Sequence, residues 1–158
     1  MANPENNIKS KIYEDPITVT DFYVRYAETD AMRVVHHAAY LVYFEEGRSQ
    51  LMRNLGRDYA DIEASGFMLP VTEVNVRYVG SLVYGNQVKI STRLTENRSR
   101  RVTFTYEVRG PEPDDVLVSG YTRHIWTNSK GAVTRVPEQW QKLFEKWKPL
   151  AAADYYID

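Results

Sequence analysis

The chain has 158 residues, of which 43% are hydrophobic and 26% are charged, values typical of one globular domain. Its formal net charge of −1 gives no overall basic field, so nucleic acid and anionic lipid are not expected partners. Cysteine is absent, which excludes disulfides, thiolate metal sites and a cysteine nucleophile. The sequence shows no secretory signal and no membrane span, and we therefore expect a cytoplasmic protein.

The first predicted element is a β-strand that begins at Ile17, after a polar segment, 1–16, that we expect to be flexible. Its apolar alternation shifts by one position, from Ile17 and Val19 to Phe22. Because side chains of a strand alternate between two faces, this shift predicts a β-bulge near Thr20–Asp21.

The strongest helical pattern follows, over residues 38–55. Its apolar face is formed by Tyr40, Phe44, Gly47, Leu51 and Leu55. Glycine weakens a helix interior by about 1 kcal/mol, so Gly47 predicts a close approach to a neighbouring backbone. A short helix is expected over Tyr59–Ser65.

Most of the remaining chain has the pattern of an antiparallel sheet. The predicted strands are Met68–Tyr78, Gln87–Thr95, 101–109 and Val116–Thr127, with turns at Asn97–Arg100 and Pro111–Asp115, and a short helix opens at Pro137 with Trp140, Leu143, Phe144 and Trp147 on its apolar face. One long helix and a run of strands indicate an α+β fold, in which a curled sheet would bury the helix. Exposed edge strands would favour pairing with a second subunit.

The segment Glu28-Thr29-Asp30 ends the first strand just before the long helix. It is either a solvated polar loop, or it places Asp30 opposite the helix N-terminus. In the second case, backbone N–H groups would bind an oxyanion while Asp30 attacked a thioester or activated water. His36 and His37 follow without the spacing of a metal site, so His37 is either a packing residue or a hydrogen-bond partner of substrate or Asp30.

Other candidates have an ordinary structural interpretation as well. Tyr40 and Tyr43 would pack the helix or line an acyl pocket. Arg98 and Arg100 lie in a basic turn, ENRSRR, which is either a solvated hairpin or a site for phosphate groups.

The segment RYAETDAMRVVHHAAYLVYFEEGR resembles the signature of the hotdog-fold acyl-CoA thioesterases, the family of 4-hydroxybenzoyl-CoA thioesterase and the Tol–Pal-associated thioesterases. The likeness covers about residues 17–146. It implies a hotdog domain over 17–147, with a tail at 148–158, in which a curved antiparallel sheet wraps one central helix. It also implies a homodimer or homotetramer with active sites between subunits, acting on acyl-CoA without a metal or other cofactor.

By this resemblance, Asp30 is the catalytic nucleophile or general base, and the backbone N–H of His37 polarises the thioester carbonyl, with its side chain also implicated in catalysis. The expected substrate-binding residues are Arg33, Val35, Tyr40, Tyr43, Arg98 and Arg100.

One position departs from the family pattern, because Arg33 stands where glycine is usual. Arginine there would narrow the site, contact an anionic ligand or distort the loop. The alternative function is therefore a non-catalytic module that binds acyl-CoA or acyl carrier protein. A hotdog dehydratase is disfavoured because the His-Phe-Pro-Gly loop of those enzymes is absent.

Overall fold

The computed structural model describes residues 17–146. The predicted N-terminal segment 1–16, the C-terminal tail 148–158 and Trp147 lie outside the described residues. The elements in chain order are β1 (Ile17–Tyr23), the 3-10 helix η1 (Tyr26–Glu28), α2 (Ala39–Asn54), α3 (Tyr59–Ala64), β2 (Phe67–Met68), β3 (Val71–Tyr78), β4 (Gln87–Arg98), β5 (Arg101–Arg109), β6 (Val116–Ile125), β7 (Thr127–Asn128) and α4 (Glu138–Phe144). Within this part of the chain, no helix is long and apolar enough to cross a membrane.

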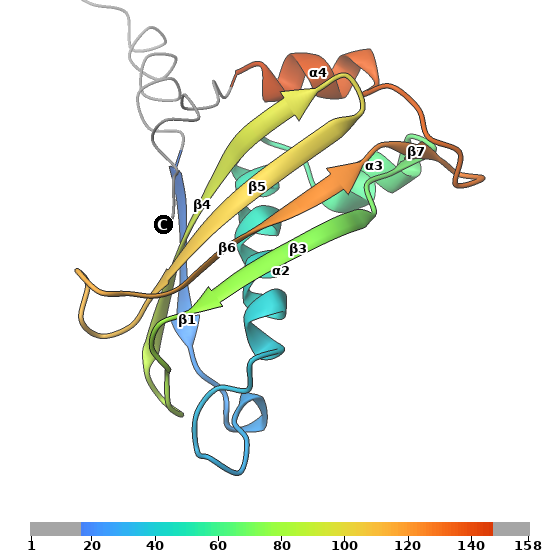
Figure 1. The fold of residues 1–158 in the computed structure, drawn as a ribbon. Coiled ribbons are helices and arrows are strands. Elements are labelled where there is room, and N and C mark those ends of the chain that lie inside the picture. The colour runs from blue at the N-terminus through green and yellow to red at the C-terminus, as the bar shows by residue number, and fades with distance from the viewer. Residues whose placement is uncertain (1–16, 147–158) are drawn as a thin grey trace, which may run out of the picture.

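The main sheet has five antiparallel strands in the order β1-β4-β5-β6-β3, and β2 pairs separately with β7. Figure 1 shows this twisted sheet wrapped across α2, with α4 at the end where the β4–β5 hairpin turns. The helix packs mainly against β4 and β1. The predicted α+β architecture, a curved sheet around one long helix, is confirmed.

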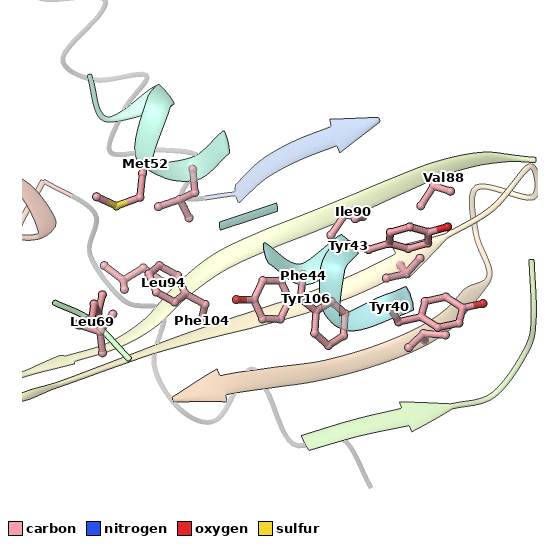
Figure 2. Close-up of a cluster of buried hydrophobic side chains, with 14 of the residues drawn as sticks. Tyr40, Tyr43, Phe44, Met52, Leu69, Val88, Ile90, Leu94, Phe104 and Tyr106 are labelled. Atoms are coloured by element: carbon pink, nitrogen blue, oxygen red, sulfur yellow. The ribbon is translucent and has the colours of Figure 1, made fainter. Parts of the chain in front are cut away.

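The core lies between α2 and the sheet, where large side chains of the helix meet those of the strands (Figure 2). The ring of Phe44 stacks on that of Tyr106, with centroids 4.3 Å apart. A Cβ atom at Gly47 would collide with Oγ1 of Thr92 and crowd Ile90 on β4. Gly47 therefore allows the predicted close approach, although its neighbours there are side chains rather than backbone.

The β-bulge predicted near Thr20–Asp21 is wrong. Strand β1 pairs with β4 without any shift of register. Thr18 and Thr20 are buried against the helix, whereas Val19 is 58% exposed. The apolar pattern shifts because polar threonines occupy the buried face; Thr18 is stabilised there by an N–H of Asn54, 3.3 Å from its hydroxyl.

The strand predicted over Met68–Tyr78 is interrupted and forms β2 and β3. Pro70 stands at the break, and proline cannot donate a hydrogen bond to a sheet. Strand β3 is an edge strand of the main sheet. Its Val71, Val74 and Tyr78 are each more than two-fifths exposed, so this edge presents apolar side chains as well as open backbone groups.

Candidate active site

The Asp30 loop, residues 29–35, is closed by backbone hydrogen bonds. The N–H of Asp30 donates to the carbonyl of Val34 at 3.0 Å, and the N–H of Arg33 donates to the carbonyl of Asp30 at 2.9 Å. One carboxylate oxygen of Asp30 accepts the N–H of Met32 at 2.8 Å. The Thr29–Val35 bridge completes the loop. Asp30 is half-buried. Its carboxylate is held at one oxygen by the N–H of Met32, and the other oxygen has no hydrogen-bond partner among residues 17–146.

Arg33 has a φ of 63°, and in residues 17–146 it is the one non-glycine residue with positive φ. This left-handed conformation costs a non-glycine residue about 1–2 kcal/mol. The hydrogen bonds around Arg33 are nevertheless formed, so an arginine at this position leaves the loop regular. Its side chain is exposed on the Asp30 loop.

The start of α2 is held by three contacts on consecutive residues. The N–H of His36 donates to the carbonyl of Glu28 at 2.8 Å. The N–H of Ala38 donates to Nδ1 of His36 at 3.1 Å. The hydroxyl of Tyr78 donates to the carbonyl of His37 at 2.9 Å. Among the described residues, the N–H of His37 has no hydrogen-bond partner. It lies at the positive end of the α2 dipole, where an N–H can stabilise an oxyanion.

The residues of α2 that are predicted to bind substrate belong to the buried core. Tyr40 and Tyr43 are almost fully buried, and burial raises the pKa of both hydroxyls. The hydroxyl of Tyr40 accepts the N–H of Leu82 at 3.3 Å, and that of Tyr43 donates to Glu28 at 2.7 Å. Val35 is also buried, and its N–H donates to the carbonyl of Leu82 at 2.8 Å.

Arg98 and Arg100 lie far from Asp30 in the same chain. The Asp30 loop contacts the connection before β4, through Leu82, whereas Arg98 ends that strand. Twelve residues of strand span about 40 Å at roughly 3.3 Å per residue. The structure therefore does not bring these arginines together with Asp30 and His37 within one chain.

The third histidine, His124, belongs to the core rather than to the site. Its Nδ1 is 3.0 Å from the carbonyl of Leu69, which can only accept, so Nδ1 carries the proton. Its Nε2 then accepts from the hydroxyl of Thr122 at 2.8 Å. Thr122 in turn accepts from the hydroxyl of Tyr106 at 2.7 Å. His124 is 1% exposed, and in residues 17–146 no three potential ligands gather into a metal site.

Sequence reasoning gave no role to two residues that shape this site. In the sequence, Glu28 stands out only as an acid of the loop before the long helix, and Tyr78 only as the last residue of a predicted strand. A signal for Glu28 was present, because this residue stands two positions before Asp30 in the segment that resembles the thioesterase signature. Nothing in the sequence links Tyr78 to His37, which is 41 positions away.

Comparison with known proteins identifies similar chains. Residues 24–144 match the model of the thioesterase-like superfamily. A putative acyl-CoA thioesterase, YneP, of Bacillus subtilis is 33% identical over 78% of this chain and 87% of its own length. A DHNA-CoA thioesterase from Staphylococcus aureus is 31% identical, with a TM-score of 0.78 over 82% of this chain and 89% of that one. A hypothetical protein, TT1821, from Thermus thermophilus is 35% identical, with a TM-score of 0.79 over 83% and 99%.

Proposed function

The chain belongs to the thioesterase-like superfamily, and we propose that it hydrolyses an acyl-CoA thioester to the free acid and CoA. The observation that carries the proposal is that a half-buried carboxylate, Asp30, and an unpartnered N–H, that of His37, lie on one hydrogen-bonded segment that leads into α2. The relatives named as acyl-CoA and DHNA-CoA thioesterases support the same reaction.

In the proposed mechanism, the thioester carbonyl oxygen accepts the N–H of His37. Asp30 then takes a proton from water, and the resulting hydroxide adds to the carbonyl carbon. Alternatively, the Asp30 carboxylate adds directly, and water hydrolyses the anhydride that forms. In both routes the C–S bond breaks, the CoA thiolate leaves with the electron pair and is protonated, and the N–H stabilises the negative oxygen of the intermediate. The side chain of His37 is exposed beside this reaction and could bind the substrate.

The substrate contacts are part of the proposal. Arg33 is suited to an anionic part of the substrate because it is an exposed arginine on the Asp30 loop itself. Val35, Tyr40 and Tyr43 would form the apolar wall of the acyl site. The reaction needs no metal or cofactor, so we expect chelators to leave turnover unchanged.

We further propose that the protein is a homodimer or homotetramer. The support is the open edge of β3, which exposes Val71, Val74 and Tyr78, because such an edge favours pairing with another strand. Arg98 and Arg100 are too far from Asp30 to bind a substrate at the site of their own chain. They would contact phosphate groups only of a substrate that is bound elsewhere. The cytoplasmic location also stays a prediction.

The test is release of free thiol from short, long, branched and aromatic acyl-CoAs by the wild type and Asp30→Asn. Asparagine keeps an oxygen that can accept the N–H of Met32, so the loop is expected to survive. We expect turnover to fall by about 10²–10⁴-fold. Asp114→Asn, in the exposed turn before β6, is the matched control.

If Asp30→Asn has full activity on an acyl-CoA that the wild type hydrolyses, Asp30 is not the catalytic group. Binding of acyl-CoA by the wild type without turnover of any substrate would instead support the non-catalytic module. The observation that favours that alternative is Arg33 at the usual glycine position, and Arg33→Gly would then be the variant to assay for restored turnover.

A further inference from the structure

The carboxylate of Glu28 joins two parts of the site that are separate in the chain, the segment that precedes Asp30 and helix α2. Its Oε2 accepts the N–H of Arg25 at 2.8 Å and the hydroxyl of Tyr43 at 2.7 Å. Its Oε1 accepts the Arg25 guanidinium at 2.7 Å. The side chain is 15% exposed. Both oxygens are thus occupied by donors of the protein, which leaves little room for this acid to act on a substrate itself.

The backbone around Glu28 connects the same carboxylate to the reacting groups. The carbonyl of Glu28 accepts the N–H of His36 at 2.8 Å, next to the unpartnered N–H of His37. Asp30 follows two residues later in the chain. Tyr43 lies one helical turn beyond Ala39, the first residue of α2. The Glu28 side chain therefore fixes the separation between α2 and the segment that carries Asp30.

The charge state of Glu28 suits this role. Burial alone would raise its pKa, but the hydrogen bonds from the Arg25 N–H, the Tyr43 hydroxyl and the Arg25 guanidinium lower it below its ordinary value. An ionised carboxylate forms stronger hydrogen bonds than a neutral amide of the same shape. Replacing it with glutamine would also direct an NH₂ donor at a group that itself donates.

We propose that Glu28 is a positioning residue, which holds Asp30 and the N–H of His37 at the separation that thioester hydrolysis needs. The proposal rests on the proposed function for its kinetic consequence. A misplacement of about 1 Å at a reacting group can cost 100-fold in rate. The loss is expected in kcat, because Glu28 contacts neither the carbonyl nor the leaving group.

The test compares Glu28→Gln, Tyr43→Phe and the double variant with the wild type. Kinetics are measured on an acyl-CoA that the wild type hydrolyses, and amide hydrogen exchange is followed over residues 30–37. Glu107→Gln is the matched control. It is a half-buried glutamate that pairs with Arg109 at 2.9 Å, away from the site. Unfolding curves of every variant establish that the comparison is between folded proteins.

We expect Glu28→Gln to lower kcat by about 10- to 100-fold with little change in KM, and to speed exchange of the His36 amide. Tyr43→Phe should add nothing to the kinetic loss in the Glu28→Gln background, since both changes break one contact. Glu107→Gln should match the wild type in both measurements.

Folded Glu28→Gln protein with wild-type kcat would overturn the proposal, as would a loss confined to KM. If the wild type hydrolyses no thioester, the proposed function fails, and the exchange measurement decides alone. An unchanged His36 amide would then show that Glu28 does not hold this segment, and a faster one would show that it does.

Discussion

Acidification should destabilise this protein through one buried group, His124. The ring is neutral in the fold because its Nε2 must accept from Thr122 while its Nδ1 donates to the carbonyl of Leu69. A second proton would remove the acceptor. Burial lowers the pKa of His124 from 6.5 to about 4; nearby Arg48 adds to this, and the bond to Leu69 opposes it.

The sign and size of the effect follow from this shift. The unfolded chain takes up its proton near pH 6.5 and the folded protein only near pH 4. The contribution of His124 to stability is therefore complete above pH 6.5, decreases as the pH falls, and is lost at about pH 4. The total is about 3 kcal/mol, of which about 2 kcal/mol disappears between pH 7 and pH 5. Most carboxylates titrate below this range.

The measurement is urea unfolding of the wild type and His124→Gln at half-unit steps from pH 7 to pH 5. Glutamine can donate to Leu69 and accept from Thr122 but does not titrate. Its packing will differ, so the slopes of unfolding free energy against pH are compared rather than the absolute values. We expect the wild type to lose about 2 kcal/mol more than the variant over this range. Parallel slopes would refute the argument.

Three further changes test local features. Arg33→Gly should raise the free energy of unfolding by about 0.5–1 kcal/mol in urea titrations, since glycine adopts the positive φ without strain. A lower free energy of unfolding would show that the backbone of Arg33 is not strained. Gly47→Ala should lower the free energy of unfolding by about 1–3 kcal/mol because it overpacks the contact with β4. Adding Thr92→Ala to this variant should partly restore its melting temperature, because the second change removes the colliding hydroxyl. Tyr78→Phe should cost about 0.5–1.5 kcal/mol in urea unfolding and lower kcat, whereas an unchanged kcat would show that the His37 carbonyl needs no support.

The sequence predicted elements well where apolar spacing matches burial. Helix α2 was expected over 38–55 and occupies Ala39–Asn54, and β5 was expected and found over 101–109. The bulge in β1 was wrongly predicted because the buried face of this strand holds Thr18 and Thr20, which binary patterning counts as polar. The break at Pro70 was overlooked because valines resume directly after it.

The candidate site shows a similar division. The motif drew attention to Asp30 and His37, and the structure places both on one hydrogen-bonded segment, although their catalytic roles stay predictions. Arg98 and Arg100 were included for their charge alone, and a sequence does not show that a strand will carry them to the far end of the sheet. The role of Glu28 depends on a partner, Tyr43, that is recognised only once the helix is built.

The site is assembled from contacts of very different span along the chain. Glu28 and Tyr43 are 15 positions apart, whereas Tyr78 reaches His37 over 41 positions and Tyr40 reaches Leu82 over 42. Short loops close at lower entropic cost than long ones. During refolding, the Glu28 contact can therefore form with α2 alone, while the His37 carbonyl acquires its donor only when β3 joins the sheet. Recovery of activity would then report the pairing of β3 with the sheet rather than the formation of the helix.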